Sequence, residues 1–67
     1  MNFNGEELML MMLYNTGSRL GLIHELWLMQ CYLMPDETAL RELSEGVIEK
    51  LKLMTDAQFA EVEFPMD

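Results

Sequence analysis

The chain has 67 residues, of which 51% are hydrophobic, and its 12 acidic and four basic residues give it a net charge of -8. So short a chain forms one domain, with little room for both a core and a deep catalytic cleft, and it is too apolar to be disordered. The negative charge disfavours direct binding to nucleic-acid phosphates or anionic lipid surfaces, which would repel the chain. The single cysteine, Cys31, excludes a secreted disulfide scaffold. No apolar run approaches the length of a membrane span, and no basic stretch precedes an apolar one as in a secretory signal, so a cytoplasmic protein is expected.

The first helix is predicted from about Gly5 to Tyr14. Asn4 is a favourable N-cap, and Glu7 stands three residues later, as in a capping box. Gly17 can adopt the left-handed conformation that commonly ends a helix. Residues 15–18 are therefore expected to form the first turn.

The second helix is expected to begin after Thr16 or Ser18, either of which can cap it, and to run to about Leu33. Pro35 ends this helix, because the residue before a proline avoids helical geometry. Pro35 is also acceptable as the first residue of a third helix, with the two acidic residues that follow it in the first turn.

The second half of the chain is predicted to be helical as well. Ser44 and Gly46 indicate a break or a new cap, and Val47 to Met54 then shows helical spacing. Residues 55–58 repeat the capping-box pattern, so a last short helix should end near Glu61. The predicted fold is all-α, a small compact bundle of three longer helices plus one or two short ones. Residues 1–61 form a single domain, and residues 62–67 are expected to be a flexible acidic tail.

The first half of the chain carries more apolar residues than a core this small can hold. Residues 8–13 surround the axis of the first helix, and two adjoining faces of the second helix are apolar. Helices of this kind need cover on most sides, so part of this surface should be exposed or covered by a partner or a second copy of the chain. The candidate interface residues are Met9, Met12, Trp27 and Met29, since methionine adapts to irregular partners. The plainer interpretation is that these residues are core, with Trp27 as a core anchor.

The sequence gives no catalytic, metal-binding or cofactor-binding constellation. His24-Glu25 begins like a zinc-protease signature, but Leu28 stands where the second histidine would be needed. Cys31 lies seven residues from His24, about 10.5 Å along a helix, which is too far for a thiol–imidazole pair. We expect Cys31 to be an inert buried thiol on the apolar face that carries Trp27.

The acidic residues of the second half have two interpretations. They can form a solvated outer face that keeps an apolar protein soluble, or a surface that mimics a nucleic-acid backbone and inhibits a host defence enzyme. The residues concerned are Glu37, Glu42, Glu45, Glu49, Asp56, Glu61, Glu63 and Asp67.

One segment carries a family resemblance. Residues 14–19 read Tyr14, Asn15, Thr16, Gly17, Ser18 and Arg19, and the matching positions that follow are Gly21–Ile23, Tyr32–Leu33, Lys50–Leu51, Met54–Asp56 and Phe59. With these residues the chain resembles the transposon-transfer assisting protein family, short acidic proteins of bacterial conjugative transposons. The resemblance covers about residues 3–59 and implies an accessory role in transfer, in the bacterial cytoplasm, without catalytic residues. We interpret Tyr14, Asn15, Thr16, Gly17 and Arg19 as structural, with Arg19 tying the turn to a carboxylate such as Glu25 or a later one.

The resulting hypothesis is an adaptor that binds a protein of the transfer machinery through the apolar surface of the first two helices. Neither nucleic acid nor membrane is expected as a partner. A homodimer is a further way of covering the same surface. The alternative is the acidic mimic described above.

Overall fold

The computed structural model describes residues 3–64. Within them the chain forms four helices and no strand: α1 (Gly5–Tyr14), α2 (Arg19–Cys31), α3 (Thr38–Leu53) and α4 (Asp56–Ala60). Three of these helices are long and one is short, so the predicted all-α bundle is confirmed. None of the helices in residues 3–64 combines the length and the hydrophobicity needed to cross a lipid bilayer.

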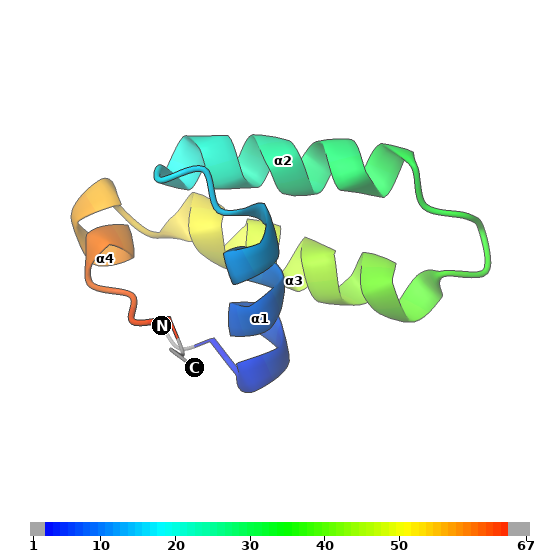
Figure 1. Ribbon diagram of the computed structural model, residues 1–67, viewed down its shortest axis with the longest axis horizontal. Coiled ribbons are helices and arrows are strands. Elements are labelled where there is room, and N and C mark those ends of the chain that lie inside the picture. Colours follow the sequence, from blue (N-terminus) through cyan, green and yellow to red (C-terminus); the bar gives the residue numbers. More distant parts are fainter. Residues whose placement is uncertain (1–2, 65–67) are drawn as a thin grey trace.

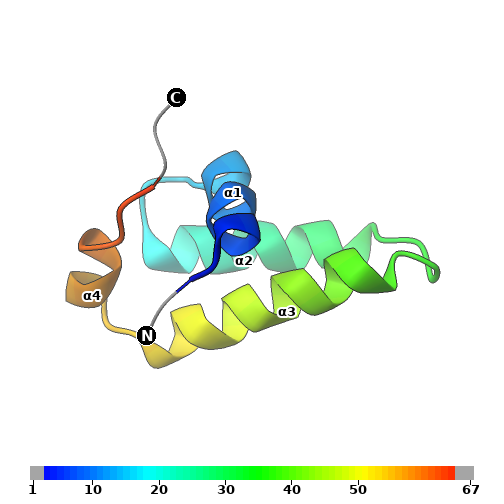
Figure 2. The same ribbon diagram turned by 90° about the horizontal axis from the view of Figure 1, so that it is seen from below.

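The bundle is built from an antiparallel pair of helices with a third laid across it. Figure 1 shows α2 and α3 side by side, α1 running crosswise over them, and α4 at the end of the pair where α2 begins. The view turned by 90° shows α1 against α2 and α3 from one side, and all three helices contact one another (Figure 2). The core lies where they meet, and its buried apolar residues are Leu10, Met11, Leu22, Leu26, Val47, Ile48, Leu51 and Met54.

Local capping explains where three of the helices begin. Asn4 Oδ1 accepts a hydrogen bond from Glu7 N at 2.8 Å, and Asn4 N donates one to Glu7 Oε1 at 2.9 Å, which confirms the predicted capping box of α1. Thr55 and Gln58 form the corresponding pair at α4. Ser18 is the N-cap of α2, since its Oγ accepts from Gly21 N at 3.0 Å.

The loop between α2 and α3 differs from the prediction at both ends. The second helix ends at Cys31, before the predicted Leu33, and the third begins at Thr38, so the prediction that Pro35 starts it is wrong. Glu37 N donates to Met34 O at 3.0 Å, which closes a four-residue turn with Pro35 at its second position. The fixed φ of proline suits that position as well as it suits the first turn of a helix.

The predicted break at Ser44 and Gly46 is also wrong, because α3 is continuous through both residues. Ser44 is fully buried, and its Oγ donates to Arg41 O at 3.0 Å and accepts from Gln30 Nε2 at 2.8 Å. A Cβ built on Gly46 would lie 3.6 Å from Glu7 Oε2, an ordinary van der Waals contact, so Gly46 faces α1 but a small side chain would also fit there. Neither residue ends the helix.

The end of the described chain packs back onto the bundle. Val62 and Phe64 are half-buried against the core, beyond the domain boundary predicted at residue 61. The rest of the predicted tail, residues 65–67, lies outside the described residues, so its flexibility stays a prediction.

Candidate functional site

The segment between α1 and α2 is a tightly organised turn. Asn15 Oδ1 accepts from Gly17 N at 2.9 Å, and Gly17 has φ +93°, a left-handed conformation that favours glycine. A Cβ on Gly21 would lie against Thr16 Oγ1 and 2.7 Å from the Ser18 Oγ that caps α2. Glycines at these two positions therefore allow the turn to fold closely onto the first turn of α2.

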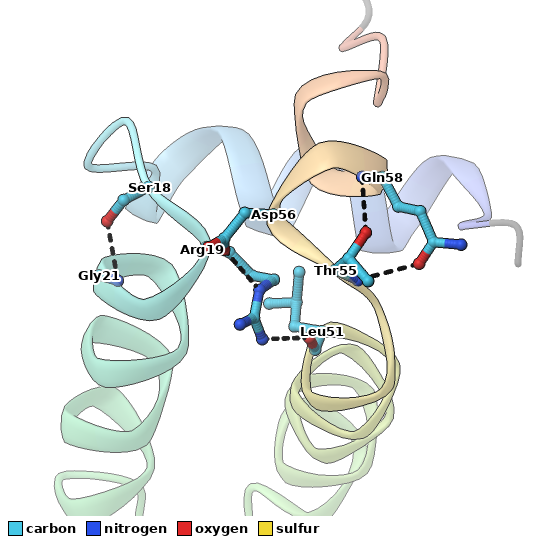
Figure 3. A network of polar contacts seen from close by, with 7 residues as sticks. All are labelled: Ser18, Arg19, Gly21, Leu51, Thr55, Asp56 and Gln58. Carbon is cyan, nitrogen blue, oxygen red and sulfur yellow. Dashed lines mark hydrogen bonds and ion pairs between the residues drawn. The ribbon is translucent and has the colours of Figure 1, made fainter.

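Arg19 connects this turn to the far end of the chain. Its Nη1 donates to Leu51 O at 2.9 Å, near the C-terminus of α3, and its Nε donates to Asp56 Oδ1 at 2.9 Å (Figure 3). The Arg19 side chain is 17% exposed, whereas that of Asp56 is 79% exposed. Figure 3 also shows the Thr55–Gln58 cap directly beside this contact. The predicted carboxylate partner of Arg19 is thus a later one, Asp56, in place of the named candidate Glu25.

A second polar contact joins α1 to α3. The carboxylate of Glu7 is buried, and Lys50 Nζ donates to its two oxygens at 2.7 and 3.0 Å. Burial by itself would raise the pKa of the Glu7 carboxyl, but the hydrogen bonds from Lys50 and Asn4 and the positive charge of Lys50 outweigh burial, so this pKa lies below its ordinary value. Lys50 Nζ also lies 5.4 Å from the centroid of the Phe3 ring.

The structure divides the predicted interface residues among different surfaces. Met9 and Met12 lie on the outer side of α1, with 63% and 41% of their surface exposed. Trp27 is 56% exposed and lines a groove of about 490 Å³ with residues of α3. Met29 is half-buried and lines a different groove, of about 450 Å³, beside Tyr14. Trp27 and Met29 are two residues apart, about 200° around a helix, so they cannot share a surface.

Two expectations about α2 are wrong. Trp27 is not a core anchor, and Cys31 is exposed, not buried. Both expectations assumed that the face carrying these two residues points inward, but Leu22 and Leu26, on the adjoining face, are the fully buried residues of α2. Because α1 and α3 together cover only one broad side of α2, its second apolar face is left at the surface.

Residues 3–65 match the family described as "putative transposon-transfer assisting protein". The chain belongs to this family. The match confirms the resemblance carried by residues 14–19, and it includes every helix of the bundle. Among curated proteins and solved structures, none matches the chain.

The family description indicates a role in assisting transposon transfer and names no chemistry. In this chain, residues 14–19 make the internal contacts of the turn and of Arg19 described above, and Tyr14 packs against the core (Figure 3 shows Ser18 and Arg19). His24 is exposed on α2. Among residues 3–64, no three side chains of histidine, cysteine, aspartate or glutamate come together as metal ligands would.

Sequence reasoning missed two polar contacts of the core. The sequence predicts Glu7 only as part of the cap of α1 and gives Lys50 no partner, yet the two side chains pair across the α1–α3 contact. The buried Ser44 and its partner Gln30 were missed as well. No local signal marks such pairs, because their members are 43 and 14 residues apart in the chain.

Proposed function

We propose that this protein is a non-catalytic accessory factor of conjugative transposon transfer that acts in the bacterial cytoplasm by binding another protein. The contact surface is the outer side of α1, which we call the methionine stripe and define as Met9, Met12 and Leu13. The family description supports the setting, and the exposure of the stripe supports the mode of action.

The stripe carries the proposal. Its three residues stand at i, i+3 and i+4, so they form one side of α1, and they are 63%, 41% and 79% exposed. The opposite side of the same helix supplies Leu10 and Met11 to the core. A helix that is apolar on both sides is normally covered on both, and contiguous exposed apolar side chains mark sites of protein contact. Flexible methionine side chains fit such a contact because they adapt to the partner's shape.

A mating assay tests the proposal. Deleting the reading frame from the element should lower its transfer frequency, and the wild-type chain supplied in trans should restore it. The double variant Met9→Lys, Met12→Lys should fold but fail to restore transfer, because two ammonium groups in an apolar contact should weaken binding by about tenfold or more.

The matched control is the double variant His24→Lys, Ala57→Lys, which adds the same positive charge at exposed positions outside the stripe. This control should restore transfer, and circular dichroism should show wild-type helicity for both variants. Full restoration by the stripe variant would contradict the proposal.

Affinity capture from donor cells then identifies the partner and separates the two functional classes. Capture of relaxase, coupling or secretion components that survives high salt and is lost with the stripe variant supports the adaptor. Capture of a DNA-binding defence enzyme that is lost at high salt, and is indifferent to the stripe variant, supports the acidic inhibitor instead.

A further inference from the structure

The groove beside Trp27 is a second surface, and none of the three residues of the methionine stripe lines it. It has a volume of about 490 Å³ and opens along the α2–α3 pair seen side by side in Figure 1. Trp27 and Gln30 line it from α2, and the remaining lining residues, all from α3, are Glu42, Glu45, Gly46, Ile48, Glu49 and Lys52. With Trp27 56% exposed and Ile48 almost completely buried, the groove offers an aromatic wall beside an apolar core residue.

The other wall of the groove is acidic and regularly spaced. Glu42, Glu45 and Glu49 stand at i, i+3 and i+7 on α3, so they follow one side of that helix over about 10.5 Å. All three are exposed, and within residues 3–64 they take part in neither of the two ion pairs, Arg19–Asp56 and Lys50–Glu7. Lys52 also lines the groove, so the three glutamates and this lysine give the lining a net charge of -2.

The combination of an indole face and carboxylates in a row fits a basic occupant. An arginine can place its guanidinium over the indole or pair with a carboxylate, while its aliphatic stem covers apolar surface. The occupant is not a second copy of the chain, because each copy has a net charge of -8 and would bring acidic residues toward the glutamates. It is not a nucleic acid, since phosphates would meet the same repulsion.

We propose that the Trp27 groove binds a basic amphipathic helix of a partner protein, whose arginines lie opposite Glu42, Glu45 and Glu49 and whose central arginine stacks on Trp27. A helix laid along α3 matches the spacing of the glutamates with its own positions i, i+3 and i+7. The inference rests on the proposed function in taking protein binding as the mode of action, but it uses a different surface and names the chemistry of the partner.

A peptide titration tests the groove with the full chain. The probe is a synthetic amphipathic helix of about four turns that carries arginine at three positions, i, i+3 and i+7. The control peptide has glutamine in place of each arginine. Trp27 is the only tryptophan, so its fluorescence and its indole N–H signal report on the groove alone. The arginine peptide should shift both signals, and the glutamine peptide should leave them unchanged.

Matched variants separate specific docking from general attraction to an acidic protein. Glu45→Gln with Glu49→Gln should weaken binding by about three- to tenfold, since two charge pairs are lost. Glu61→Gln with Glu63→Gln removes the same charge at exposed positions near the end of the described chain and should change the affinity by less than about twofold. Equal weakening by the two double variants would overturn the proposal, as would shifted amide signals that map away from α2 and α3.

The stripe variant Met9→Lys, Met12→Lys distinguishes failure of the groove from failure of the proposed function. It should bind the arginine peptide as the wild type does, because its substitutions lie on the outer side of α1. Loss of peptide binding in this variant would overturn the assignment of the site to the Trp27 groove. If the arginine peptide does not bind the groove, the adaptor proposal still stands or falls with the mating assay of the stripe variant.

Discussion

Arg19 makes two contacts that differ in their exposure to water, and this difference predicts which one matters for stability. Its bond to Leu51 O is partly buried, whereas its ion pair involves the largely exposed carboxylate of Asp56. Arg19→Ala should therefore lower the free energy of unfolding by about 1.5–3 kcal/mol, the range for a hydrogen bond from a charged group. Asp56→Asn should lower it by less than about 1 kcal/mol, as for an exposed ion pair.

Urea denaturation followed by circular dichroism measures both changes, provided that the slope of the free energy of unfolding against urea concentration is the same in the variants and the wild type. Arg19→Lys is a useful third variant, since a single ammonium cannot reproduce the fork of two donors and should give an intermediate loss. If Asp56→Asn costs as much as Arg19→Ala, the ion pair and not the bond to the α3 carbonyl fixes the turn.

The contacts of this turn were predictable only where they are local in the sequence. The conformations of Asn15 and Gly17 follow from local chemistry, because the bond from Gly17 N to Asn15 Oδ1 spans two residues. The partner of Arg19 could be predicted only as a carboxylate, since Asp56 lies 37 residues away and only the fold brings the two together. A short motif therefore identifies the turn but not what the turn holds.

Helix boundaries set by neighbouring residues were predicted correctly, whereas those that depend on packing against another helix were not. The capping boxes at Asn4 and Thr55 were predicted because each involves residues three apart. Pro35 was misassigned because both a turn and a first helical position accept its φ, and the choice depends on how α3 packs. Ser44 suggested a break because serine is favoured at helix caps, but it lies inside α3, where its buried hydroxyl accepts a hydrogen bond from Gln30 of α2.

The contact between α1 and α3 predicts a dependence of stability on pH. The pKa of Glu7 is lower in the folded chain than its ordinary value of 4.5, so the folded state favours the ionised carboxylate. This stabilisation is fully present above the pKa of the unfolded chain and is lost as the pH falls through the lower pKa of the folded chain. Glu7→Gln should lower stability at neutral pH by about 1–3 kcal/mol and make the loss of stability in acid shallower.

Urea midpoints of wild type and Glu7→Gln, taken at neutral pH and at several values below 4.5, measure this effect. The control is Glu6→Gln, which removes the same charge from the exposed neighbouring residue in the first turn of α1. It should change neutral stability by a few tenths of a kcal/mol and leave the acid slope close to that of the wild type. Parallel pH profiles for wild type and Glu7→Gln would show that the Lys50 contact contributes nothing to folding.

For the whole molecule, the sequence predicted a surplus of apolar surface but not its position. The number of apolar residues in α1 and α2 exceeds what a bundle of this size can bury, and composition shows that directly. Which side stays exposed depends on the crossing of α1 over the α2–α3 pair, so Trp27 and Met29 were grouped together although they face different grooves. When a helix has two adjacent apolar faces, its own sequence does not show which face is buried and which stays exposed.

Exposed apolar surface and a net charge of -8 act in opposite directions on self-association, and salt shifts the balance. Raising the salt concentration from about 0.1 M to about 1 M shortens the Debye length from about 10 Å to about 3 Å, so repulsion between copies weakens while apolar contact does not. The chain should be monomeric at low salt and self-associate through the methionine stripe at high salt. Light scattering coupled to size-exclusion chromatography measures the mass, and Met9→Lys with Met12→Lys should stay monomeric throughout. A dimer that is equally stable at low salt would mean that charge repulsion does not control self-association. A dimer that persists in this variant would mean that copies meet through another surface and that the stripe stays free for a partner.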